Sequence, residues 1–89
     1  METSTSAEIK IFVERVVHAI VDYPDEVKCN LLESGTMVVV ELSAHPSDIG
    51  KVIGREGRMA QSLRVLLTAL ATKLGKKAVL QILERKEDS

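Results

Sequence analysis

Apolar residues recur at helical spacing close to the start of the chain. Thr5 and Glu8 have the spacing of a capping box at a helix N-terminus. The apolar face that follows consists of Ile9, Val13, Val16, Val17 and Ile20. The spacing predicts a helix that runs to about Asp22, because Pro24 cannot continue it.

The pattern then changes to an alternation of apolar and polar residues, which is typical of strands. It predicts one strand over residues 27–33 and a second, β-branched strand over residues 36–42, joined by a two-residue turn at Ser34-Gly35. So short a connection makes the two strands an antiparallel hairpin. The inward-facing residues would be Val27, Cys29 and Leu31 on the first strand, and Val38, Val40 and Leu42 on the second.

Helical spacing returns in the second half of the chain. Pro46 suits the first position of a short helix over about residues 46–53, and Gly54 to Gly57 interrupts it. A long helix over about residues 58–73 follows, with Gly75 as its C-cap, and a last strand over residues 78–83. The apolar stripe of the long helix, expected in the core, consists of Met59, Leu63, Leu66, Leu67, Leu70 and Leu74.

The order of these elements is α-β-β-α-α-β, which predicts an α+β fold. Two helices separate the last two strands, so these strands can lie parallel through a right-handed crossover. The result would be a three-stranded mixed sheet with three helices on one face. With 89 residues the chain has room for one domain, over residues 7–84, with a flexible N-terminus (1–6) and a frayed tail (85–89).

Composition narrows the function. No apolar run is long enough to cross a bilayer, and the N-terminus does not resemble a secretory signal. The single cysteine, Cys29, excludes an internal disulfide and a cysteine-rich zinc site. His18 and His45 do not stand in a pattern typical of metal ligands or of a nucleophile with its base. We therefore expect a cytoplasmic protein without a cofactor, a metal or enzymatic activity.

The net charge of −1 conceals a strong asymmetry. Residues 1–49 carry three basic residues against nine acidic ones, whereas residues 50–77 carry seven basic residues against Glu56 alone. A polyanion would therefore meet one basic segment of the chain, although charge of this kind is also typical of an ordinary solvated surface.

The basic segment contains a glycine-bounded loop between two helices, Gly54-Arg55-Glu56-Gly57. Glycine allows a positive φ and a close approach of the backbone to a ligand. Free N–H groups at the start of the next helix favour an anion, and Arg55 and Arg58 can donate charge-assisted hydrogen bonds to phosphate. The glycine spacing matches neither a P-loop nor a dinucleotide-binding fingerprint.

The string Val52-Ile53-Gly54-Arg55-Glu56-Gly57 resembles the signature of the K-homology (KH) domain, and the element order resembles the bacterial type II form of that fold. Four stretches further resemble the small bacterial single-KH RNA-binding proteins of the KhpA type, from about Ala7 to Arg85. These stretches are residues 22–27, 48–54, 57–64 and 75–77.

The resemblance implies that the loop clamps the backbone of about four nucleotides of single-stranded RNA, with the bases in an apolar groove. The implied RNA-binding residues are Lys51, Ile53, Gly54, Arg55, Glu56, Gly57, Arg58, Arg64, Lys76 and Lys77. The implied groove residues are Ile49, Val52, Ala60 and Val79.

The resemblance also implies an RNA chaperone or post-transcriptional regulator that is linked to cell elongation, division and shape. The implied partner, besides RNA, is a second copy or a KH protein of the KhpB/Jag type. Val65 lies off the core stripe and is a candidate dimer contact or a lone surface valine.

Glu56 departs from the family's usual loop and predicts modest RNA affinity, because its carboxylate opposes Arg55. The alternative interpretation is a KH-fold adaptor that has weak or lost RNA binding and serves as a dimerisation partner.

Overall fold

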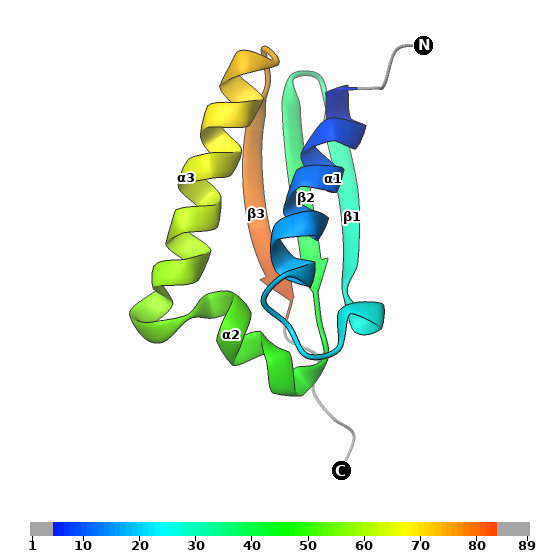
Figure 1. Ribbon diagram of the computed structural model, residues 1–89. Coiled ribbons are helices and arrows are strands. Elements are labelled where there is room, and N and C mark those ends of the chain that lie inside the picture. The colour runs from blue at the N-terminus through cyan, green and yellow to red at the C-terminus, as the bar shows by residue number, and fades with distance from the viewer. Residues whose placement is uncertain (1–4, 84–89) are drawn as a thin grey trace.

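The computed structural model describes residues 5–83 (Figure 1). Its helices and strands follow the predicted order and are α1 (Thr5–His18), β1 (Lys28–Ser34), β2 (Met37–Ser43), α2 (Ile49–Ile53), α3 (Arg58–Lys73) and β3 (Lys77–Leu83). Short 3-10 turns precede β1, α2 and α3, at Pro24–Glu26, Pro46–Asp48 and Arg55–Gly57. The α+β class of the type II KH fold is confirmed.

The three strands form one mixed sheet in the order β1-β2-β3. β1 and β2 pair antiparallel, and β2 and β3 pair parallel, as the crossover through α2 and α3 predicts. Ser34 pairs with Met37, so the hairpin turn is Gly35-Thr36, one residue later than predicted. A one-residue difference in the turn does not change which residues of β2 face inward.

The helices cover one face of the sheet, with α1 and α3 side by side on it and α2 at its lower end (Figure 1). Val38, Val40 and Leu42 of β2 are completely buried under them, as predicted. From α3 the core receives Ala60, Leu63, Leu67 and Ala71.

Two sequence predictions about the helices are wrong. Leu66 is half exposed, because the buried line of α3 runs through Leu63 and Leu67 and leaves Leu66 at the side of the helix. α1 ends at His18 and not near Asp22. Val21 still donates its N–H to the carbonyl of Val17, but the next backbone donors, Asp22 and Tyr23, bond to the side chain of Asp48.

The predicted tails lie mostly outside the described residues. Thr5 and Ser6 already belong to α1. The remaining tail residues, 1–4 and 85–89, lie outside the described residues, as does residue 84.

Candidate nucleic-acid interface

The loop between α2 and α3, residues 54–57, is a tight bend in which three of the four residues have a positive φ. Gly54 has φ 79° and ψ 172°, Glu56 has φ 56°, and Gly57 has φ 74°. The N–H of Gly54 donates to the carbonyl of Gly50 at 2.8 Å, and the N–H of Gly57 donates to the carbonyl of Gly54 at 3.1 Å. The loop is therefore closed by its own backbone hydrogen bonds.

The two glycines of the loop are needed for different reasons. A Cβ on Gly54 would lie 2.6 Å from the Cβ of Met59 and 2.8 Å from its backbone nitrogen, so the start of α3 leaves no room for a side chain. A Cβ on Gly57 would meet nothing within 4 Å. Gly57 is required only by its left-handed conformation, which costs other residues free energy.

Arg55, Glu56 and Arg58 project from this bend and are all exposed. The Arg58 guanidinium lies 3.8 Å from the Glu56 carboxylate, and both side chains are more than 70% exposed. An ion pair this open to solvent holds its partners weakly. The guanidinium groups at the loop therefore remain accessible to an anion, although one carboxylate competes for them.

A shallow surface lies along the flank of α3 next to β3. A hollow of about 250 Å³ is lined by Gln61, Arg64, Val65 and Thr68. A second hollow, of about 400 Å³, shares Thr68 and extends over Thr72, Lys77 and Val79. These two hollows along the α3 flank and the adjoining end of β3 are therefore bordered by five residues that the sequence singled out: Arg64, Val65, Lys76, Lys77 and Val79.

Other predicted groove residues lie elsewhere. Val52 is 0% exposed and Ala60 is 3% exposed, so their side chains belong to the buried core. Ile49 and Ile53 are partly buried at the two ends of α2. The groove prediction does not fit Val52 and Ala60, because buried side chains cannot contact a base.

Lys76 and Lys77 lie at the end of α3 remote from the loop (Figure 1). The sixteen residues of α3 span about 24 Å, so these lysines cannot act at the same phosphate as Arg55. Lys76 is 22% exposed and lies 3.9 Å from the carboxylate of Glu33 on β1. The basic residues of this segment are thus spread along the length of α3 and do not all converge on the loop.

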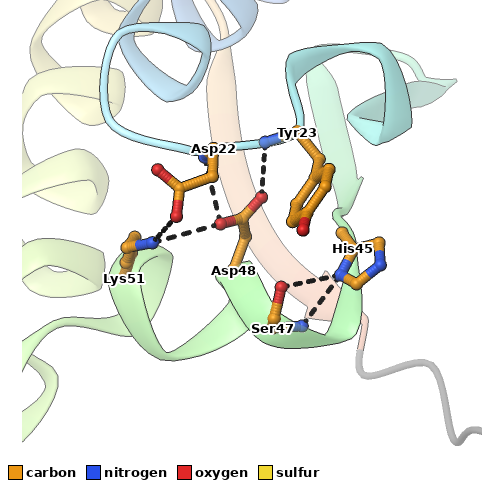
Figure 2. A network of polar contacts seen from close by, with 6 residues as sticks. All are labelled: Asp22, Tyr23, His45, Ser47, Asp48 and Lys51. Carbon is orange, nitrogen blue, oxygen red and sulfur yellow. Dashed lines mark hydrogen bonds and ion pairs between the residues drawn. The ribbon is translucent and has the colours of Figure 1, made fainter.

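Lys51 points toward Asp22 and Asp48 and joins a polar network (Figure 2). Its ammonium group pairs with the Asp22 carboxylate and lies 3.5 Å from the Asp48 carboxylate. Asp48 is 0% exposed and accepts the backbone N–H groups of Asp22 at 3.1 Å and Tyr23 at 2.9 Å.

The network changes the acid–base properties of its members. Burial alone would raise the pKa of Asp48, but the backbone donors of Asp22 and Tyr23 together with Lys51 outweigh it, and the pKa lies below its ordinary value. The hydrogen bond to Asp22 raises the pKa of Lys51, and the nearby carboxylates act in the same direction. Asp48 stands in a stretch that carried the family resemblance, but a buried acidic residue gives no sequence signal of its own.

An aromatic pair also holds the linker between α1 and β1, residues 19–27. The rings of Tyr23 and His45 stack with centroids 4.3 Å apart. Nδ1 of His45 accepts the N–H of Ser47 at 3.1 Å and thereby caps the 3-10 turn before α2 (Figure 2). His45 therefore connects the start of α2 to the linker between α1 and β1.

The described residues contain neither a metal-binding cluster nor a membrane-spanning helix. Between residues 5 and 83 there is no group of three or more His, Cys, Asp and Glu side chains placed to hold a metal ion. No helix in the same range is long and apolar enough to cross a membrane.

The fold and the glycine-bounded loop define a KH-domain protein, and comparison with known proteins gives the family. The model of the KhpA/KhpB KH domain matches residues 10–82. The RNA-binding protein KhpA of Aquifex aeolicus is 45% identical over 76 residues, which cover 85% of this chain and 96% of that protein. The RNA-binding protein KhpA of Halalkalibacterium halodurans is 42% identical over 85% of this chain and 100% of that protein. The RNA-binding protein KhpA of Mycobacterium bovis is 46% identical over 73% of this chain and 81% of that protein. The chain belongs to the KhpA/KhpB KH-domain family.

Proposed function

We propose that the protein binds single-stranded RNA, without catalysis, through the loop from Gly54 to Gly57. The observation that carries the proposal is the bend itself. Gly54 packs so closely on Met59 that only glycine fits, and this packing presents Arg55 and Arg58 to solvent at the start of α3. The relatives of the chain are RNA-binding proteins by name, which supports the same ligand.

The RNA path follows from the exposed groups. A phosphate at the bend would be bound by Arg55 and Arg58, and the strand would continue along the α3 flank past Arg64 and Thr68. Val79 offers apolar contact to a base near the end of this path, and Lys77 adds a positive charge there. Because the flank carries no aromatic ring, we expect modest affinity and broad base preference.

The proposed physiological role is that of a cytoplasmic RNA chaperone or post-transcriptional regulator, linked to cell elongation and division, that acts as a dimer with itself or with a KhpB/Jag-type protein. The support on the molecule is the pair of adjacent apolar residues on α3, Val65 and Leu66, which are 60% and 50% exposed. Sedimentation of Val65→Lys tests the pairing, since a dimer that keeps its mass excludes Val65 from the interface.

The second candidate function is an adaptor with little RNA binding. Glu56 favours it, because this carboxylate stands between Arg55 and Arg58 in sequence and 3.8 Å from the Arg58 guanidinium. An adaptor would keep the fold and the partner surface without needing an accessible positive loop.

A salt titration separates the two functions. The variant Arg55→Gln/Arg58→Gln is compared with Arg15→Gln/Lys28→Gln, which removes two exposed basic residues from α1 and β1. Binding of a short single-stranded RNA is measured by fluorescence anisotropy at several salt concentrations. Each phosphate contact contributes about 0.7 to the slope of log affinity against log salt, so the loop variant should lose about 1.4 and the control little. Equal slopes in both variants would exclude the loop as the phosphate site and favour the adaptor.

A further inference from the structure

The side chain of Asp48 does not serve the helix that it begins. Asp48 occupies the N-cap position of α2, where a carboxylate ordinarily accepts N–H groups of its own first turn, yet it makes no such capping bond. Its two oxygens reach instead to the backbone of the α1–β1 linker, at Asp22 and Tyr23 (Figure 2). The start of α2 is thus fastened to a segment 25 residues earlier in the chain.

α2 needs such an external anchor. It has only five residues, Ile49–Ile53, with Val52 as its single buried one. A helix this short is not stable by itself, and Gly50 in its first turn lowers its helix propensity further. Gly54 directly follows α2 as its C-cap, so any tilt of α2 would move the loop relative to α3.

Lys51 completes the anchor formed by Asp48 with Asp22 and Tyr23, and its ammonium group is engaged there by two carboxylates. Its ammonium group lies between the carboxylates of Asp22 and Asp48, and the three side chains together carry one net negative charge. A phosphate at Lys51 would have to displace Asp22 and approach Asp48. The local charge therefore opposes phosphate binding at Lys51, whereas Arg55 and Arg58 face solvent.

We propose that Asp48 is a positioning residue for the RNA-binding loop, and that Lys51 is its counter-ion and not a phosphate ligand. The proposal rests on the proposed function and makes it more specific, because it removes one basic residue from the RNA contact and assigns two acidic ones to the loop's support. When the anchor is lost, α2 samples other orientations, and the loop is competent to bind for only part of the time. The apparent dissociation constant then rises by the inverse of that fraction.

The first test needs no RNA. Amide hydrogen exchange is measured in the free protein for the wild type, Asp48→Asn and the control Asp25→Asn, which removes the same charge from an exposed position in the same linker. Asp22 and Tyr23 donate to different oxygens of the Asp48 carboxylate. Asparagine cannot reproduce this arrangement, because an NH₂ donor replaces one of the two oxygens. We expect Asp48→Asn to accelerate exchange at Gly54, whose N–H closes α2, and Asp25→Asn to leave it unchanged. Unchanged exchange at Gly54 in folded Asp48→Asn would overturn the proposal.

A second variant keeps the test decisive if Asp48→Asn does not fold. Lys51→Met removes the counter-ion and retains both backbone hydrogen bonds of Asp48, so the fold should persist and exchange at Gly54 should rise by a smaller factor. If Lys51→Met leaves exchange at Gly54 at the wild-type rate, Lys51 does not support α2 and the proposal is wrong.

The RNA measurement then separates positioning from direct contact. For Lys51→Met and Asp48→Asn we expect weaker binding, about fivefold for Asp48→Asn, with the wild-type salt slope. Arg55→Met should make the slope shallower by about 0.7. A slope loss in Lys51→Met equal to that of Arg55→Met would identify Lys51 as a phosphate ligand and refute the proposal. Failure of the wild type to bind RNA would refute the proposed function, while the exchange result would still decide the role of Asp48.

Discussion

Replacing each of three neighbouring glycines by alanine tests the geometry of the loop in detail. Gly50 lies in α2, where an added Cβ meets nothing within 4 Å and φ is ordinary. Gly57 has the same open space but a φ of 74°. Gly54 combines a φ of 79° and ψ of 172° with a Cβ position 2.6 Å from Met59. The series therefore separates helix propensity, backbone conformation and steric conflict.

The expected changes in the free energy of unfolding differ in sign and size. Gly50→Ala should stabilise by up to about 1 kcal/mol, because alanine is the better helix former. Gly57→Ala should destabilise by about 1 kcal/mol through its left-handed backbone. Gly54→Ala should cost about 3 kcal/mol or more, since a backbone conformation that is almost restricted to glycine is added to a conflict with the Cβ and backbone nitrogen of Met59.

Urea denaturation followed by far-ultraviolet circular dichroism gives the three free energies, with the slope of unfolding as a check that the transition remains two-state. A total stability of about 5–10 kcal/mol would leave Gly54→Ala folded but clearly weakened. Equal losses for Gly54→Ala and Gly57→Ala would refute the close packing of the loop on α3.

Three further predictions concern single residues. Glu56→Gln should tighten RNA binding and leave stability almost unchanged, whereas Glu56→Gly should also stabilise the fold by about 1 kcal/mol, because Glu56 has φ 56°. Fluorescence anisotropy measures the binding and urea titration the stability. Weaker binding by Glu56→Gln would mean that the carboxylate makes a useful contact with RNA. Because the pKa of Asp48 is lowered in the folded protein, its stabilising contribution is complete above the unfolded pKa of about 4 and is lost as the pH falls through the folded pKa. In urea titrations at acid pH, the wild type should therefore lose more stability than Asp48→Asn. Parallel losses would contradict the network. Burial raises the pKa of Cys29 to about 11. Alkylation of this thiol at pH 8, followed by mass spectrometry, should therefore be slow in the native protein and fast in urea. Rapid labelling of the native protein would place the thiol at the surface.

Local periodicity was sufficient to predict the hairpin and α3. The alternation at Val38, Val40 and Leu42 and the helical spacing after Arg58 each depend on neighbouring residues only, and the boundaries of α3 agree with the prediction. The end of α1 could not be predicted in the same way. It is decided by Asp48, which accepts the N–H groups of Asp22 and Tyr23 from a distant part of the chain.

The sequence predicted the glycine-bounded bend but not the partners of the lysines around it. The glycine spacing identified the loop, and the family resemblance implied its ligand. The roles of Lys51 and Lys76 depended on partners that are distant in sequence, Asp22 and Glu33, which occupy their ammonium groups. Leu66 was placed in the core because helical spacing does not tell how wide a stripe the sheet covers.

The proposed interface is tested most directly by an RNA titration observed residue by residue. Single-stranded RNA is added to the labelled protein, and the backbone amide shifts of residues 5–83 are followed by nuclear magnetic resonance. We expect the largest saturable shifts at residues 54–58, with smaller ones at Arg64 and Thr68 on the α3 flank and little change on α1. Saturable binding that leaves the loop amides unmoved, or that shifts α1 instead, would contradict the proposed interface.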